Sequence, residues 1–281
     1  MKALGYYNGH YGELDQMTVP MNDRACSFGD GLYDSAYARN GIVYSLPDHI
    51  DRIFRGAKEL GIEPPCSKEE MTAIINEMVS KVDANEVFVY WQITRGTQPR
   101  MHAYTEGLKS NLWIIIREMS IRPTYRKIKL ISREDTRFFH CNIKTLNLIP
   151  GVLAATEAKR QGCDECVFHR GDRVTECAHS NIQILKDGKL IEPPADEMIL
   201  AGIQRARIMR LCQSLGIPVE ERPFTMAELM DADEVIVSSA GSLCLSACEI
   251  DGKPVGGKNP ALLKQLQDIL HNDFMTATEK K

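Results

Sequence analysis

The 281-residue sequence lacks the features that mark several protein classes. Lys and Arg together number 34 against 38 Asp and Glu. Without a basic excess or stripe, we do not expect a nucleic-acid-binding protein. Apolar runs are short: Leu112–Ile116 falls far below the roughly 20 residues that cross a membrane. Because Met1–Gly12 contains no apolar core, we also expect no secretory signal.

The cysteines do not form a recognisable disulfide framework or metal motif. There are nine of them, an odd number without a secretory signal, which favours reduced thiols in the cytoplasm. Cys163 and Cys166 form a single CxxC with His169 nearby, but no second ligand pair follows at a suitable spacing. We therefore expect small buried side chains here and no bound metal.

What is present is the composition of a globular protein. Hydrophobic residues make up 43% and charged residues 26%, and the length fits one large or two medium domains. The spacing predicts a helix from Asp48 to about Leu60 and another after the capping box Ser67/Glu70. Strands are expected at Glu86–Thr94 and Leu112–Glu118. We place an N-terminal domain at 1–119 and a linker at 120–124.

The remaining residues, 125–281, are predicted to form a second, larger domain. Expected there are strands at Ile128–Ile131 and Glu234–Ser238, a helix over Pro150–Gln161 and a helix over Ile203–Leu215. Turns at Gly171-Asp172 and Asp187-Gly188 predict two hairpins. Because strands and helices mix without regular βαβ alternation, the fold class is α+β rather than a doubly wound sheet.

Residues 94–102 are the first candidate for chemistry. If the chain stays extended after Pro99, Arg100 and His102 point to the same side. A guanidinium beside an imidazole is suited to binding a carboxylate. The other interpretation is a solvated basic loop.

Two stretches are suited to an anion, and one lysine to covalent catalysis. Leu200–Ile203 leads into a helix whose first N–H groups are free, and Ser238–Ser242 can expose backbone N–H groups. Each stretch is weak evidence for an anion site when taken alone, because helix starts and Ser/Gly turns are common. Lys144, flanked by apolar residues, is either a partly desolvated nucleophile or a surface lysine. Glu176 and Arg52 would on general grounds face solvent.

At these residues the sequence resembles the class IV aminotransferases, the fold-type IV pyridoxal-phosphate enzymes, over nearly the whole chain. The Arg-x-His element formed by Arg100 and His102 is similar to that of the D-amino acid subgroup of this family. The matching segments are Phe28–Tyr33, His49–Arg52, Thr94–Thr97, Pro99–Arg100 with His102, Cys141–Leu148, Thr175–Glu176 and Ser180–Asn181. The resemblance implies a two-domain architecture with a barrel-like core in the C-terminal domain.

The resemblance also implies a pyridoxal 5'-phosphate site. Lys144 would carry the cofactor as a Schiff base, and Glu176 would pair with the pyridine nitrogen. Leu200 would pack against the ring. The phosphate would be held by a set of side chains and backbone groups: Arg52, Ile203, Gln204, Ser239 and Ala240. Gln204 and Ala240 stand where threonines are common, so two hydroxyls are missing.

Substrate binding and subunit structure are implied in the same way. Tyr33, Arg100 and His102 would bind the α-carboxylate, with Arg100 and His102 contributed by the other subunit of a homodimer. His179, where serine is usual, would line the substrate pocket or tune the ring. The implied reaction is D-alanine plus 2-oxoglutarate to pyruvate plus D-glutamate, with Lys144 as general base.

Other functions remain open at this point. A branched-chain L-amino acid aminotransferase or an aminodeoxychorismate lyase would share the fold, but either is expected to lack the Arg100/His102 pair. A binding protein that has lost catalysis would need neither Lys144 nor Glu176. Small amino acids and oxo acids, rather than nucleic acid or membrane, are the expected partners.

Overall fold

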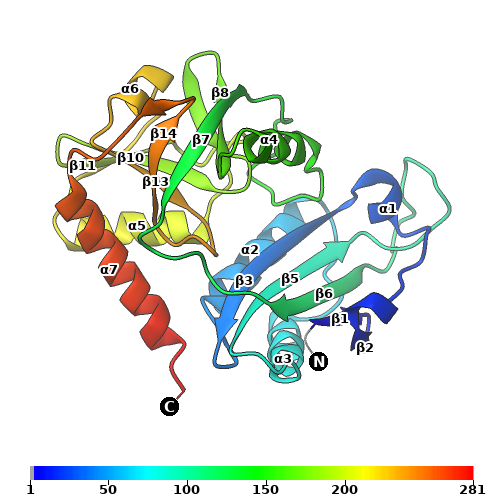
Figure 1. The fold of residues 1–281 in the computed structure, drawn as a ribbon. Coiled ribbons are helices and arrows are strands. Elements are labelled where there is room, and N and C mark those ends of the chain that lie inside the picture. Colours follow the sequence, from blue (N-terminus) through cyan, green and yellow to red (C-terminus); the bar gives the residue numbers. More distant parts are fainter. Residues whose placement is uncertain (1–2, 281) are drawn as a thin grey trace. The chain divides into compact units, whose positions relative to one another are not determined.

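The computed structural model describes residues 3–280 and divides the chain into two compact units (Figure 1). The first unit extends to Ile121 and also contains Ile143–Asn147 and the chain from Phe274 onward. The second unit consists of Arg122–Asn142 and Leu148–Asp273. The change at Ile121/Arg122 falls inside the segment expected to link two domains, whereas Ile143–Asn147 was expected in the second domain.

The first unit is built on an antiparallel six-stranded sheet in the order β2-β1-β6-β5-β3-β4. Its strands are β1 (Ala3–Tyr7), β2 (His10–Glu13), β3 (Gly31–Arg39), β4 (Ile42–Val43), β5 (Glu86–Thr94) and β6 (Asn111–Glu118). Its helical segments are η1 (Leu14–Gln16), α1 (Arg24–Phe28), α2 (Leu46–Glu59) and α3 (Lys68–Ser80). Apolar residues of α2 and α3 join those of β3, β5 and β6 in one buried core. Burial of this shared apolar surface holds the helices against the sheet.

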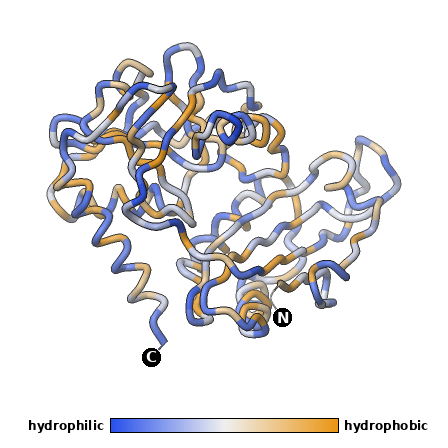
Figure 2. The backbone as a smooth tube through the Cα atoms, viewed as in Figure 1, coloured by the Kyte–Doolittle hydropathy of each residue, from blue (hydrophilic) through white to orange (hydrophobic). Residues whose placement is uncertain are grey.

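The second unit contains a nine-stranded mixed sheet in the order β12-β11-β10-β13-β14-β7-β8-β9, with β15 added to β14. The strands are β7 (Lys127–Glu134), β8 (Glu165–Arg170), β9 (Arg173–Cys177), β10 (Asn181–Lys186), β11 (Lys189–Glu192), β12 (Val219–Glu221), β13 (Glu234–Ser238), β14 (Leu245–Ile250) and β15 (Lys253–Pro254). The helices are α4 (Ile149–Arg160), α5 (Ile203–Ser214), α6 (Met226–Met230) and α7 (Pro260–Ala277), whose end lies in the first unit. Hydrophobic residues follow the strands, and the turns are mostly hydrophilic (Figure 2).

Most of the expected elements are confirmed. Strands β5 and β13 have the expected bounds, and both predicted hairpins form, as β8–β9 and β10–β11. The capping box at the start of α3 is present, with Ser67 and Glu70 each bonded to the other's backbone N–H. The α+β class is therefore confirmed. Within residues 3–280, the structure contains no helix of the length and apolarity that a membrane span requires.

Candidate functional site

Lys144 lies beside the start of β3 in the first unit. The backbone of its segment pairs with that strand: Tyr33 N donates to Lys144 O (2.9 Å) and Leu146 N donates to Gly31 O (3.1 Å). Lys144 is half-buried, and its Nζ lies 3.2 Å from the hydroxyl of Tyr33 and 4.3 Å from the centre of that ring. The segment therefore presents an amine next to a phenol at a fixed place on the sheet.

A buried ionic cluster lies on the same sheet. Asp34, on β3, is fully buried and accepts hydrogen bonds from Arg52 Nε (2.8 Å) and Nη2 (2.7 Å). His49 Nδ1 lies 2.8 Å from the same carboxylate. Both partners come from α2, three residues apart and so on one helix face. The expectation that Arg52 faces solvent is wrong, because a carboxylate inside the unit draws it in.

The charges of this cluster shift one another's pKa. Burial alone would raise the pKa of Asp34, but the Arg52 guanidinium and the His49 imidazole hold it far below its usual value. Burial lowers the pKa of His49, and the Arg52 and Lys144 cations lower it further against the opposing effect of Asp34. The Lys144 charge therefore acts on His49.

Arg100 and His102 lie on one aromatic ring, Phe28. The Arg100 guanidinium carbon is 5.0 Å from the ring centre, and the His102 ring centre is 5.2 Å from it. Both residues are exposed, and Arg100 has no hydrogen bond or ion pair within residues 3–280. The chain bends at these residues instead of staying extended, because Gln98 pulls the loop back by bonding to Ala103 O (3.1 Å). Both side chains contact Phe28. They do not share a side because of the alternating side-chain directions of a strand.

Glu176, at the end of β9 in the second unit, is buried rather than solvent-facing. Arg137 Nη1 donates to its Oε1. Its Oε2 accepts from Asn181 Nδ2 (3.0 Å) and from the backbone N–H of Leu200 (3.2 Å). These three donors hold the carboxylate in a defined orientation.

Arg137 is itself fixed by Asp135. Two side-chain bonds of 2.9 Å join the pair, and Thr175 donates to the same carboxylate (2.9 Å). These carboxylates raise the pKa of Arg137 although burial opposes the shift, and the Arg137 guanidinium keeps the pKa of Asp135 below its usual value.

Asn181 connects Glu176 to the two stretches suited to an anion. Its Nδ2 also donates to Leu200 O (2.9 Å), and Gly202, the residue before α5, packs so tightly on it that an added Cβ would lie 1.9 Å from Asn181 Oδ1. In the sheet, Asn181 pairs with Ser238, which precedes Ser239 and Ala240. The start of α5 and the Ser238–Ser242 stretch therefore meet at one residue.

The start of α5 has an unsatisfied donor. Gly202 is its N-cap, so no side chain caps the first N–H groups. Gln204 is buried, and its Nε2 has no hydrogen-bond partner within the described part of the chain. A buried amide nitrogen without a partner costs free energy unless a ligand or water accepts its proton. This donor set suits an anion.

His179 lies close to the same strand end and has a buried partner. Its Nδ1 is 2.7 Å from Glu165 Oε2, and Ser180 Oγ donates to the same oxygen (3.1 Å). Glu165 is fully buried, whereas the His179 side chain is 45% exposed. Glu165 thus fixes one ring nitrogen and leaves the other available.

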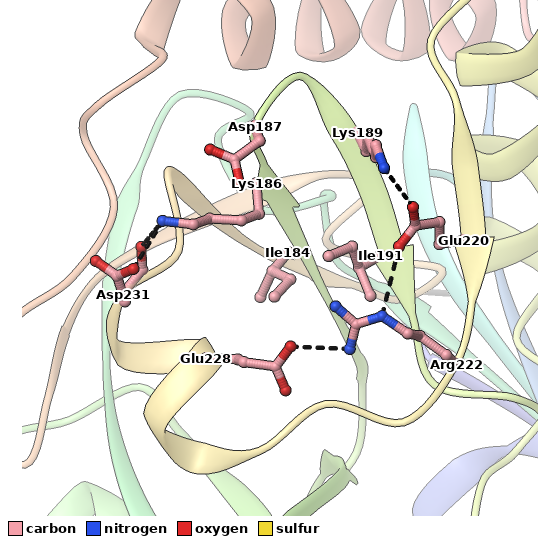
Figure 3. A pocket seen from close by; sticks show the side chains of 9 residues that line it. All are labelled: Ile184, Lys186, Asp187, Lys189, Ile191, Glu220, Arg222, Glu228 and Asp231. Atoms are coloured by element: carbon pink, nitrogen blue, oxygen red, sulfur yellow. Dashed lines mark hydrogen bonds and ion pairs between the residues drawn. The ribbon is translucent and has the colours of Figure 1, made fainter.

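A separate pocket in the second unit, lined by residues of β10, β11 and β12, does not include any of these residues (Figure 3). Its charged groups neutralise one another: Lys189 pairs with Glu220 (2.6 Å), Arg222 with Glu228 (2.9 Å) and Lys186 with Asp231 (2.7 Å). We do not assign a ligand to it.

Asp34, Arg137 and Asn181 were missed as site residues by sequence reasoning. Asp34 stands at a position of β3 whose neighbours two residues away face the core, so a charged residue there signals a buried partner. Arg137 and Asn181 give no comparable signal, because the contact that brings each of them to the site is with Glu176, on a different segment of the chain.

The comparisons with known proteins agree with one another. The family model described as Amino-transferase class IV matches residues 31–250. A D-alanine aminotransferase of Listeria monocytogenes serotype 4b is 37% identical, with 99% of this chain and 97% of that protein covered. A D-alanine aminotransferase of Bacillus licheniformis is 32% identical, with 100% and 99% covered.

A solved structure shows the same fold. The branched-chain aminotransferase from Thermoproteus uzoniensis, crystallised with norvaline, superposes with a TM-score of 0.87 at 22% identity, covering 98% of this chain and 96% of that one. The family model spans most of the sequence and the curated relatives match it almost end to end. The chain belongs to the class IV aminotransferases.

Proposed function

We propose that the protein is a D-amino acid aminotransferase that converts D-alanine and 2-oxoglutarate to pyruvate and D-glutamate. Family membership and the named relatives support amino-group transfer. The observation that carries the proposed carboxylate site is that Arg100 and His102 both contact Phe28 on one exposed loop, because a guanidinium and an imidazole are suited to binding a carboxylate. The choice of D-alanine is supported by the relatives named D-alanine aminotransferase.

We propose pyridoxal 5'-phosphate as the cofactor, and the donor set fits it. Lys144 offers the amine, Glu176 a carboxylate for the ring nitrogen, and Leu200 a flanking apolar side chain. The uncapped start of α5, with Ile203 and the unpartnered amide of Gln204, fits a phosphate. Arg52, Ser239 and Ala240 complete the proposed phosphate contacts. When bound, the cofactor supplies an aldehyde for the amino group and a ring that accepts electrons.

The residues then have distinct roles. Lys144 Nζ would remove the proton from the substrate α-carbon and then donate it to the carbon that receives the amino group. Tyr33 Oη orients that amine through the 3.2 Å contact. Glu176, oriented by Arg137, would pair with the ring nitrogen of the cofactor and favour its protonated form. His179 is proposed to line the substrate pocket through its free ring nitrogen.

We further propose a homodimer in the cytoplasm, with Arg100 and His102 serving the neighbouring subunit. An exposed apolar face on α4 supports an assembly: Ile149, Val152 and Leu153 are 69%, 54% and 64% exposed at helical spacing. Three adjacent large apolar side chains in water favour burial against a partner.

The test is to add D-alanine alone to the purified, cofactor-loaded protein and follow the visible absorbance of the cofactor. We expect the visible band to disappear as the amino group is transferred, and to return when 2-oxoglutarate is added. L-Leucine should leave the band unchanged. The Lys144→Ala variant should lack both the band and turnover.

The rival activities predict different results. A branched-chain L-amino acid aminotransferase would respond to L-leucine and not to D-alanine. An aminodeoxychorismate lyase would release pyruvate from its own substrate without a second oxo acid. Loaded protein that ignores D-alanine would overturn the proposed substrate class.

A further inference from the structure

The exposed loop Pro99–Thr105, which carries Arg100 and His102, is braced across its base. Gln98 is buried, and its amide holds both arms: Nε2 donates to Ala103 O (3.1 Å), and Oε1 accepts from Thr105 N (3.0 Å). Arg95 also contacts the loop, because its guanidinium carbon lies 4.0 Å from the centre of the Tyr104 ring. The base of the loop is thus held, although residues 99–107 are exposed.

A second brace acts at the centre of the loop. Arg24, the first residue of α1, is only 5% exposed. Its Nη1 donates to Met101 O (2.7 Å) and its Nη2 to His102 O (3.0 Å). Both ends of its guanidinium thus hold consecutive backbone carbonyls, that of Met101 between the two proposed carboxylate-binding residues and that of His102 itself.

Arg24 is itself fixed from behind. Its Nε donates to Asp30 (2.6 Å), which also accepts from Arg95 (2.9 Å), and its guanidinium carbon lies 4.8 Å from the Phe28 ring centre. Its backbone N–H donates to Gly96 O (2.9 Å). Phe28 therefore has Arg24 as well as Arg100 and His102 around it, and the loop cannot shift without breaking bonds at a buried side chain.

We infer that Arg24 is a positioning residue for the substrate carboxylate. It holds the Met101–His102 backbone so that Arg100 and His102 lie on Phe28 before substrate arrives. Ordering such a loop only on binding would cost affinity, and a loop ordered in advance avoids that cost. The inference rests on the proposed function, which assigns the carboxylate to Arg100 and His102.

The first test compares Arg24→Met and Arg24→Lys in the holoenzyme. Both variants lose the two-pronged hold, but lysine keeps the positive charge. We expect KM for D-alanine and for 2-oxoglutarate to rise about tenfold in both, with kcat changed much less and cofactor content unchanged. Arg39→Met, on β3 with a loose Glu86 contact (3.8 Å), is the matched control and should leave KM unaltered. If Arg24→Lys has the KM of the wild type, the positive charge of Arg24 is sufficient and its proposed role in positioning the loop is wrong.

The second test is a double-mutant cycle that combines Arg24→Lys with Arg100→Leu. If Arg24 had only a structural role, the effects of the two changes on KM would add. If Arg24 acts through the loop, Arg24→Lys should add little to the KM of Arg100→Leu. Fully additive effects would overturn the inference. If Arg100→Leu raises KM and Arg24→Lys does not, the inference alone falls. If Arg100→Leu leaves KM unchanged, the proposed carboxylate site is wrong and the inference falls with it.

Discussion

At the scale of single residues, Gln204 differs from the residue that is usual in its family but offers a hydrogen-bond donor of its own. Threonine was the expected residue, and the loss of its hydroxyl suggested a weaker phosphate site. The structure instead has a buried amide nitrogen without a partner at the start of α5. We propose that this amide donor takes the place of the hydroxyl at the phosphate.

Gln204→Leu tests this assignment. A hydrogen bond to a charged group contributes about 1.5–3 kcal/mol, so we expect roughly a tenfold or greater rise in the Kd for pyridoxal phosphate. The measurement is an absorbance titration of the apoprotein. Gln213→Leu, on the exposed side of the same helix, is the control and should bind the cofactor normally. Equal affinity in both variants would remove Gln204 from the phosphate site.

Gly202→Ala tests the contact beneath that helix start. The new Cβ would lie 1.9 Å from Asn181 Oδ1, so Asn181 must move away from Glu176. Overpacking of this kind costs about 1–3 kcal/mol, and we expect a lower Tm together with weaker cofactor binding. Gly12→Ala, whose Cβ would meet only Met17 Sδ at 3.6 Å, should change neither. A variant with normal cofactor affinity would show that Asn181 does not orient Glu176.

Residue-level prediction from sequence succeeded where the motif is local and failed where a partner is distant. The sequence predicts Arg52 on the solvent-exposed face of its helix, because nothing within that helix indicates that its side chain is buried. The reason is Asp34, on a strand that precedes α2 and packs beneath it. Likewise, Glu176 is buried because donors from three other segments meet it.

At the scale of elements, α2 carries a polar pair on its buried face, and this makes its stability depend on pH. The pKa of His49 is lowered in the folded protein, so the unfolded chain takes up the proton first as the pH falls below about 6.5. Stability from this group is therefore present above that pH and is lost below it. Asp34, with an ordinary value near 3.8 that folding lowers, acts in the same direction only at more acidic pH.

His49 accordingly lowers the free energy of unfolding between pH 7 and pH 5, by up to about 1.4 kcal/mol per pH unit for one proton. Glu192, whose pKa burial raises to about 7, acts in the opposite direction in the same window, so the His49 effect is read from the difference between wild type and variant. His49→Gln should be less stable overall at pH 7, and its stability should fall less than that of the wild type between pH 7 and pH 5. Urea unfolding at several pH values measures both quantities, with His10→Gln, an exposed histidine, as the control. A slope that His49→Gln does not reduce would mean that another group titrates.

The elements themselves were the most predictable part of the chain. Helical spacing, caps and β-rich runs located α2, α3, α5, β5 and β13 because these signals are local. The placement of Ile143–Asn147 was not predictable, since its partners are the backbone groups of Gly31 and Tyr33, more than a hundred residues earlier. Such pairing depends on the sheet register, which no short pattern encodes.

At the scale of the whole molecule, local patterns predicted two α+β domains but not the strand order. In the second sheet β7 lies between β14 and β8, parallel to both, although β14 follows β7 by more than a hundred residues. Pairing at this distance is decided by burial of both sheet faces rather than by any turn. The fold class was therefore predictable from the sequence, and the family resemblance added the two-domain architecture with a barrel-like core but no strand order.

Subunit assembly is the proposal that whole-molecule experiments decide best. If Arg100 and His102 serve the neighbouring subunit, a site in a dimer combines Lys144 from one chain with Arg100 from the other. A dimer of one Lys144→Ala chain and one Arg100→Leu chain then has one site with both changes and one site with neither. If each chain serves its own site, both sites of that dimer are defective.

Mixing the two variants therefore gives opposite outcomes for the two arrangements. After equal amounts are unfolded and refolded together with pyridoxal phosphate, random pairing makes half of the dimers mixed. Sites shared between subunits should then recover about a quarter of wild-type activity, since one site in each mixed dimer is intact. Each variant refolded alone is the control for residual activity, and Ile149→Glu with Leu153→Glu on the apolar face of α4 should abolish recovery by blocking assembly. Activity no higher than the mean of the two controls would place Arg100 and His102 in the site of their own chain.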